Sequence, residues 1–194
     1  SPHLEIFRKK GIEVILLHEQ VDEWVVSHLL DFQGKKLQSV TKGQLDLGEL
    51  EDEQEKKETE KASSELKPLV DRIKVVLGEK VKEVRVTHRL TTSPACLVAD
   101  EHGMDANLER LLKAAGQQVP ASQRIMEINP HHPLMEAIKD EKDEPRFSDW
   151  VLILFDQAML SEGGQLDDPA TFVNRLNQML VQMVKPVSRL ILPH

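Results

Sequence analysis

The pattern of apolar and polar positions in the first 42 residues predicts a small unit of alternating helices and strands. Ser1-Pro2 is typical of a helix start, and Gly11 follows at a position typical of a helix end. The nearly continuous apolar run at 12–17 then predicts a strand that is buried on both faces.

A second helix and a returning strand are expected in the same unit. Apolar residues at helical spacing predict a helix from Val21 to Leu30, Gly34 indicates a turn, and 37–41 indicates a strand. Because a fragment of about 40 residues cannot bury such strands alone, we interpret residues 1–42 as the truncated end of a larger α/β domain.

Residues 43–61 differ in composition from what precedes them, because acidic side chains replace apolar ones. This pattern indicates a linker or a solvated helix, and interleaved lysines predict that its second half joins a helix ending at Gly78. Within that helix, Pro68 indicates either a kink or the true start. The acidic residues are Asp46, Glu49, Glu51, Asp52, Glu53, Glu55, Glu58 and Glu60.

A mixed α+β pattern occupies the rest of the chain. Strands are predicted at 81–90, 95–99 and 124–128, with a helix at about 105–115 before Gly116. Helices follow: a short one after Pro133, one at about 146–162, and one that begins with the cap Asp168-Pro169. We therefore predict a three-stranded α+β domain over 62–182 that ends in a helical hairpin, followed by a tail at 183–194 with no assigned role.

The two long helices of the hairpin carry more apolar surface than one stripe each requires. Pairing with a second copy would cover the excess as a two-fold four-helix bundle. Packing of both faces on the α+β core explains the same pattern equally well. The expected dimer-interface residues are Trp150, Leu154, Phe155, Ala158, Phe172, Leu176, Met179 and Leu180.

Composition narrows the classes of function. The 194 residues carry 33 acidic and 25 basic side chains. Binding to nucleic acid is driven largely by basic side chains that displace counterions from the phosphates, so nucleic acid is not an expected partner. Apolar runs are too short to span a membrane. The single cysteine, Cys96, excludes an internal disulfide and indicates a reducing, cytoplasmic compartment.

Metal and catalytic chemistry find little support in the sequence. His131 and His132 are flanked by prolines, which separates their side chains, so we expect turn and cap roles for them and no metal site. Cys96 in an apolar strand is expected to be an inert, buried thiol. The spacing supports no catalytic constellation of serine, cysteine, histidine and aspartate.

Four stretches together resemble the carboxy-terminal part of the ninety-kilodalton heat-shock protein chaperones, in their bacterial form. Several long matches in the same order are far more specific than one short motif, and they span about residues 1–182. The stretches are Ser1-Pro2-His3-Leu4-Glu5 with Lys9-Lys10-Gly11-Ile12-Glu13-Val14; Val21-Asp22-Glu23-Trp24; Val86-Thr87-His88-Arg89-Leu90 with Pro94-Ala95; and Asp167-Asp168-Pro169 with Arg175-Leu176-Asn177.

The resemblance implies a dimerising, client-contacting part of an ATP-dependent chaperone. Residues 1–42 would be the end of the middle domain and 62–182 the dimerisation domain. ATP and Mg²⁺ would bind an amino-terminal domain outside this sequence, so this part is expected to need no cofactor and to have no ATPase activity. The ending Leu192-Pro193-His194 lacks the acidic tail that recruits repeat-containing cochaperones, so that partner class is not expected.

The resemblance also assigns contacts with non-native client proteins to two places. A tryptophan beside an acidic residue, Glu23-Trp24, would lie on the client-facing side of the domain boundary. The helix at 104–115 would project into the dimer cleft and offer Met104, Leu108, Leu111 and Leu112. Judged from the residues alone, that amphipathic stripe is more often core, which leaves a purely structural oligomerisation fragment as the alternative.

Overall fold

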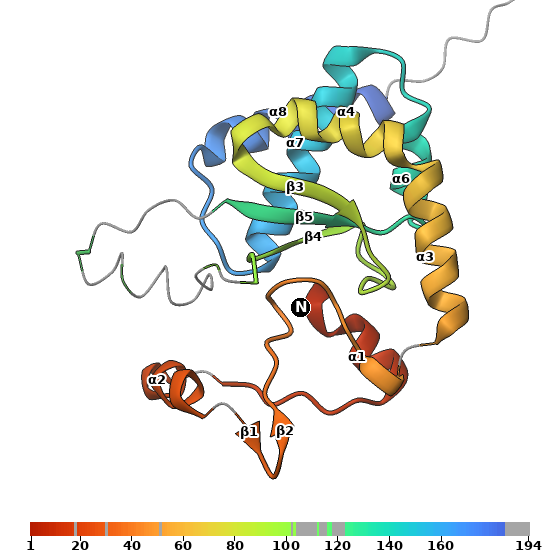
Figure 1. The fold of residues 1–194 in the computed structure, drawn as a ribbon. Helices are drawn as coiled ribbons and strands as arrows, with labels where there is room; N and C mark the ends of the chain where they lie inside the picture. The colour runs from red at the N-terminus through yellow and green to blue at the C-terminus, as the bar shows by residue number, and fades with distance from the viewer. Residues whose placement is uncertain are drawn as a thin grey trace, which may run out of the picture.

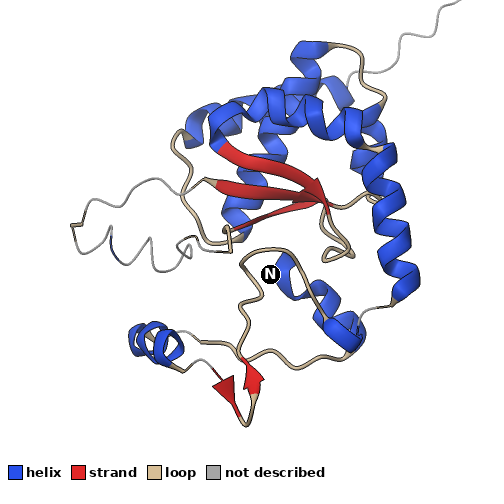
Figure 2. Cartoon of the chain, in the orientation of Figure 1, coloured by secondary structure: helices blue, strands red, loops and turns tan. Residues whose placement is uncertain are grey.

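The structure is a computed structural model that describes residues 1–17, 19–29, 31–50, 52–101, 103, 112, 116–117 and 123–184. Its centre is a three-stranded sheet of β3 (Val81–Val86), β4 (Ala95–Val98) and β5 (Arg124–Ile128), in the order β3-β5-β4 (Figures 1 and 2). Strand β5 pairs in parallel with β3 and antiparallel with β4. All three strands confirm the sequence-based predictions within a few residues.

One face of this sheet carries the main core. Alternate strand residues point to it, and helices α4 (Lys67–Leu77) and α7 (Glu144–Ser161) pack against it. Complete burial of each large apolar side chain in such a core stabilises the fold by about 1.5–3 kcal/mol. The fully buried residues include Ile73, Leu97, Met126, Ile128, Met135, Ile138, Phe147 and Leu154.

The acidic stretch forms a separate helix, α3 (Glu53–Glu65). Leu66 is both its C-cap and the N-cap of α4, so Pro68 lies in the first turn of α4. Proline is favoured there because its missing N–H has no helical partner. The expectation that α3 continues into the next helix is therefore wrong at Leu66, and Pro68 marks a true helix start.

The helices after β5 agree with the predictions. Helix α6 (Pro133–Lys139) is followed by α7 and by α8 (Pro169–Val184), which form the expected hairpin. Asp168 accepts hydrogen bonds from the Thr171 amide at 3.0 Å and from the Thr171 hydroxyl, which confirms the predicted cap. None of the helices in the described ranges is long and apolar enough to cross a membrane.

The amino-terminal part differs from its prediction. Helix α1 (Glu5–Lys10) ends at Gly11 in the left-handed conformation as expected, and α2 covers Gln20–His28. The predicted strand at 12–17 is wrong, because these residues form no strand and Ile15 and Leu16 are 76% and 70% exposed. Ile12 and Val14 pack against the cluster of Ile6, Phe7 and Leu45, but none of the described strands pairs with this run, so it lacks the neighbours that a covered strand requires.

The returning strand is also shorter and earlier than predicted. Strands β1 (Asp31–Phe32) and β2 (Lys35–Lys36) form a two-residue hairpin around a turn with positive φ at Gln33 and Gly34. The turn at Gly34 is thus confirmed, whereas a strand at 37–41 is wrong. Two paired residues on each side bury too little to stabilise a longer ladder.

The start of the predicted linker packs instead of remaining in solvent. Gly43 and Leu45 are buried, and Leu45 forms a small apolar cluster with Ile6 and Phe7 of α1. This cluster is separate from the main core of the sheet. The solvated helix foreseen for the acidic stretch corresponds to α3.

Candidate functional site

A first candidate contact surface lies on the amino-terminal part. Its large apolar side chains are exposed, and we call it the amino-terminal apolar surface. Trp24 is 65% exposed on α2 and stacks on His28 with 4.6 Å between ring centroids. The members of the surface are Ile15, Leu16, Leu17, Val21, Trp24, Val25, Leu29, Phe32 and Leu37.

Two of the predicted client-contact positions lie on the described backbone of α2, and one of them, Trp24, is part of this surface. Glu23 and Trp24 are neighbours in α2, whose first turn is closed by a reciprocal capping box between Glu19 and Asp22. Met104, Leu108 and Leu111 lie outside the described residues. Leu112 is in a helical turn and half-buried, and Gly116 follows with the positive φ of a helix end.

A second candidate contact surface is on α8, where Met179 is the one fully buried residue. Apolar side chains along its outer side are about half exposed or more, together with one residue near the end of α7. We call this the α8 surface, and it consists of Leu160, Val173, Leu180, Val181, Met183 and Val184. Phe172 and Leu176 are half-buried between it and the body of the chain.

The predicted interface residues of α7 have a different place. Leu154 is 2% exposed, and Phe155 and Ala158 are also buried in the main core, while Trp150 is half-buried against it. The structure thus places this stripe inside one chain, because α4 and the sheet cover it. Within the hairpin, the exposed apolar side chains lie chiefly on α8.

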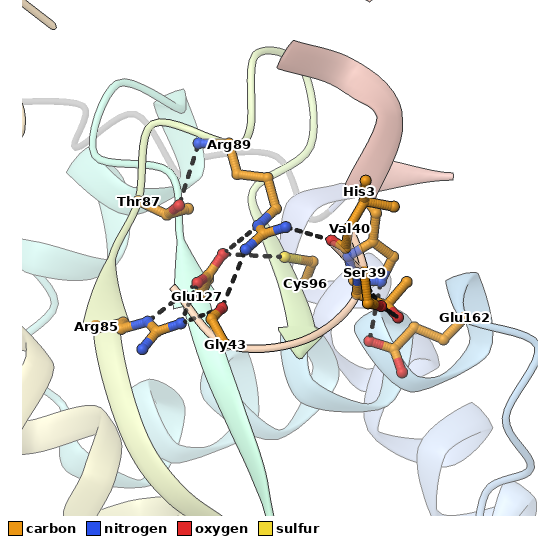
Figure 3. Close-up of polar contacts among 11 residues, drawn as sticks. His3, Ser39, Val40, Gly43, Arg85, Thr87, Arg89, Cys96, Glu127 and Glu162 are labelled. Carbon is orange, nitrogen blue, oxygen red and sulfur yellow. Dashed lines mark hydrogen bonds and ion pairs between the residues drawn. The ribbon is translucent and has the colours of Figure 1, made fainter. Parts of the chain in front are cut away.

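A buried cluster of charged side chains lies on the other face of the sheet (Figure 3). Arg85 of β3 donates two hydrogen bonds to Glu127 of β5, at 3.0 and 2.6 Å, and Arg89 donates a third at 2.8 Å. Both arginines also donate to the Gly43 carbonyl, and Arg89 donates to the Val40 carbonyl. Arg89 and Glu127 are each only 1% exposed.

Two further groups complete the surroundings of this cluster. The Thr87 hydroxyl accepts from the Arg89 backbone amide at 3.1 Å, and the Cys96 thiol lies 3.9 Å from Glu127. Burial raises the pKa of the Cys96 thiol well above its ordinary value, so the thiol stays protonated. The prediction of a buried cysteine in an apolar strand is confirmed.

A second polar contact joins α1 to the turn after β3. The Glu5 carboxylate accepts hydrogen bonds from the backbone amides of Thr91, Thr92 and Ser93 at 2.6 to 3.2 Å, and from the Ser93 hydroxyl. Burial alone would raise the pKa of Glu5. The hydrogen bonds outweigh burial and lower that pKa from 4.5 to about 2.

Two further contacts between ionisable side chains add to the connection between the amino-terminal part and the rest. His3 lies 3.4 Å from Glu162, which also accepts from Arg124 at 3.2 Å. Lys10 of α1 lies 2.7 Å from Glu55 of α3. The hydrogen bond and charge of Lys10 lower the pKa of Glu55.

These polar contacts were not foreseen from the sequence. Arg89 belongs to a stretch that was used only for the predicted strand at 81–90 and for the family resemblance, and Glu127 interrupts an otherwise apolar strand. A lone acid within a buried strand is a usable signal, because a buried carboxylate requires a cationic partner. The identity of that partner depends on strand pairing, which the sequence pattern did not specify.

The histidine pair has the structural role that was expected. His132 is the N-cap of α6, and its Nδ1 accepts the Leu134 amide at 3.2 Å. The His131 amide donates to the Asn129 side chain. Across the residues that the structure describes, no group of three or more histidine, cysteine or acidic side chains could hold a metal ion.

Comparison with known proteins identifies the family. The family described as "Hsp90 protein" matches residues 1–189. The chain is 66% identical over 183 residues to the chaperone protein HtpG of Aromatoleum aromaticum, a match that covers 94% of this chain and 28% of that protein. It is 61% identical to HtpG of Nitrosomonas eutropha over 95% of this chain and 28% of that protein, and 64% identical to HtpG of Nitrosospira multiformis over 93% and 28%. The chain thus spans under a third of the length of these relatives, and it belongs to the Hsp90 chaperone family.

Proposed function

We propose that this chain is the homodimerisation and client-contact module of an ATP-dependent chaperone. The observation that carries the proposal is the α8 surface, which exposes a row of apolar side chains on a helix that is otherwise well ordered by caps and by Met179. Exposed apolar patches of this kind mark sites of protein association. Membership of the Hsp90 family supports the chaperone assignment.

The dimer would form by pairing α8 with its two-fold copy, with the ends of both α7 helices completing a four-helix arrangement. In a two-fold interface the same patch serves on both subunits, so a single apolar surface is sufficient. Arg175 fixes the position of α8 on α7, because it lies 3.1 Å from Asp149 and 3.6 Å from Asp156. The proposed interface therefore centres on Val173, Leu180, Val181 and Val184.

The test introduces charge into that surface. In the variant Val173→Asp/Leu180→Asp, two carboxylates from each copy would meet at the interface, and sedimentation should show monomers at concentrations where the parent dimerises. The control Asn174→Asp/Gln178→Asp adds the same charge to exposed polar positions of α8. A dimer that survives the first variant, or an equal loss in the control, contradicts the proposal.

Client contact is proposed at the amino-terminal apolar surface and at the helix that includes Leu112. Glu23, Trp24, Met104, Leu108, Leu111 and Leu112 remain the proposed contact residues. Tryptophan is favoured at such surfaces because it offers a large area with few rotatable bonds. Each surface is small, so one site binds weakly, and a dimer that presents two sites to one client binds more tightly.

Binding of reduced, carboxymethylated α-lactalbumin, a permanently unfolded protein, tests client contact. Trp24→Ser should weaken binding with little change in stability, whereas Lys36→Ser on the neighbouring hairpin should leave both unchanged. Leu111→Ser/Leu112→Ser should also weaken binding. A large loss of stability in this double variant, with unchanged binding per folded molecule, would favour the purely structural alternative.

ATP hydrolysis and its coupling to clients would involve parts of the protein outside this chain. The proposal therefore expects no ATP turnover by this chain alone. A cytoplasmic location fits the single, buried, reduced cysteine.

A further inference from the structure

We infer that the buried cluster of Arg85, Arg89 and Glu127 is a positioning device that fixes residues 40–43 on the sheet, and with them the amino-terminal apolar surface relative to the α8 surface. The inference rests on the proposed function only in treating those two surfaces as contact surfaces. Within the cluster, Arg89 is the principal positioning residue, because it contacts two backbone carbonyls of the segment and the buried carboxylate together.

The two faces of the sheet show why a positioning device is needed. Alternate residues of the strands contribute Leu97, Met126 and Ile128 to the main core on one face. On the other face, the apolar cluster formed by the described residues consists of Leu90, Cys96, Val98 and Ile125. Among these residues apolar packing on the second face is small, and the segment before α3 covers it (Figures 1 and 3).

The backbone of residues 41–43 lies along the open edge of the sheet, beside the end of β4. The Ala99 amide donates to the Thr41 carbonyl at 3.0 Å, and the Gly43 amide donates to the Ala99 carbonyl at 2.9 Å. This is a single isolated bridge between Lys42 and Ala99 and not a continued strand. The net contribution of two backbone hydrogen bonds to stability is modest, so additional contacts must set the position.

The apolar contacts of the amino-terminal part do not supply them. Ile6, Phe7 and Leu45 form a cluster that does not merge with either cluster of the sheet. A cavity of about 70 Å³ lies between α1 and residues 38–46, and Arg89 forms part of its lining. Charged groups therefore take the place of an apolar contact at this junction.

The geometry of arginine accounts for the choice of residue. A guanidinium has donors in a rigid fork, so Arg89 can bind Glu127 through Nε and the carbonyls of Val40 and Gly43 through its two terminal nitrogens. A lysine ammonium can replace one of these contacts but cannot make all three in the same geometry. The substitution Arg89→Lys thus retains the buried charge pair and removes the link to the segment.

The sole cysteine of the chain reports directly on this junction. Cys96 is fully buried beside Glu127 and Arg89, and exposed thiols elsewhere are absent from the sequence. Its reaction with the thiol reagent 5,5′-dithiobis(2-nitrobenzoate) therefore measures opening of this face of the sheet. Hydrogen exchange of the β5 amides, measured in parallel, reports whether the sheet itself remains folded.

The test compares three conservative variants of the full chain. Arg89→Lys should accelerate Cys96 labelling by about tenfold or more, because a hydrogen bond from a charged donor contributes roughly an order of magnitude to such an equilibrium. Arg85→Lys should accelerate it less, since Arg89 still holds both carbonyls. The matched control is Arg72→Lys, which alters an arginine that contacts Phe147, Glu141 and Glu144 away from this junction.

Each outcome is decisive. Faster labelling in the order Arg89→Lys, Arg85→Lys, Arg72→Lys, with β5 still protected, supports the inference. Unchanged labelling in a folded Arg89→Lys chain, or equal acceleration in Arg72→Lys, overturns it. If Arg89→Lys loses β5 protection, the same comparison is made with Arg85→Lys. Faster Cys96 labelling than in Arg72→Lys then supports the inference, and labelling equal to that of Arg72→Lys overturns it. A failure of the proposed function gives a different result, because the parent chain would then show neither dimerisation nor client binding. The rate of Cys96 labelling would still report on the junction in that case.

Discussion

The part of the chain before α3 and the part from α3 onward bury their apolar residues very differently. The later part has a continuous core between the sheet and helices α3, α4, α6 and α7, whereas the earlier part has one cluster around Ile6, Phe7 and Leu45. The earlier part also exposes a broad apolar surface that includes Trp24 and Ile15. Because of this difference in apolar packing, the later part can specify its own fold, while the earlier part depends on polar contacts for its placement.

The largest expected effect comes from replacing one buried phenylalanine in the main core, compared with one in the amino-terminal cluster. Phe147→Ala in the main core should lower the free energy of unfolding by about 3–5 kcal/mol, because the ring is completely buried. Phe7→Ala should instead accelerate hydrogen exchange mainly at residues 4–14 and leave β5 protected. Chemical denaturation combined with hydrogen exchange measures both. A loss of β5 protection in Phe7→Ala that equals the effect of Phe147→Ala would contradict the comparison.

The next effect distinguishes core from contact surface within the helical hairpin. Leu154→Ala should destabilise each chain by about 2–5 kcal/mol at any protein concentration, since Leu154 packs inside one chain. Leu180→Ala should change the stability of the monomer little and weaken association, since Leu180 is half exposed. Denaturation at several concentrations checks both. Equal, concentration-independent losses would remove Leu180 from the proposed interface.

A smaller effect concerns the contact between Glu5 and the turn at 91–93. The pKa of Glu5 is about 2 in the folded chain and near 4.5 when the contact is absent, so its stabilising contribution is fully present above pH 4.5. That contribution is lost as the pH falls from about 4.5 toward 2. Glu5→Gln should therefore flatten the decline in stability over this window. Thermal unfolding at pH 5 and pH 3 measures the change, and an identical decline in variant and parent would contradict it.

The smallest expected effect uses two neighbouring lysines. Lys10 is mostly buried and lies 2.7 Å from Glu55, whereas Lys9 is mostly exposed at 3.7 Å. Lys10→Ala should cost up to about 1 kcal/mol at low salt, and Lys9→Ala should have almost no effect, because solvent screens the exposed pair. Denaturation with and without added salt tests the ranking. Equal effects would show that Lys10 has no special role in placing α1.

The same contrast explains how far the sequence could predict the structure. In the later part, the sequence pattern located three strands, helices α6, α7 and α8 and the cap at Asp168, because the partners of each element lie within the chain. In the earlier part, the apolar run at 12–17 has the pattern of a covered strand, but only Ile12 and Val14 pack against a cluster and no described strand pairs with the run, so it forms no strand. Local pattern predicts a strand correctly only where the chain also supplies its neighbours.

For the candidate contact residues too, the sequence was informative at some positions and not at others. The sequence pattern did not decide whether the apolar stripe of α7 forms an interface or part of the core. The structure places Leu154 in the core because α4 lies over it. Trp24 was selected through resemblance and not through pattern; its side chain is exposed, and its contact with clients stays a prediction. The Arg89–Glu127 contact was missed because it joins residues 38 positions apart, which no local pattern reveals.

If α8 pairs two copies while the earlier part presents an exposed apolar surface, hydrogen exchange should depend on protein concentration in only one of the two regions. Amides of residues 173–184 should gain protection as the concentration rises, while amides of residues 12–37 should exchange at a constant rate. Protection that grows at residues 12–37, with α8 unaffected, would instead assign the pairing of copies to the earlier part and rule out pairing through α8.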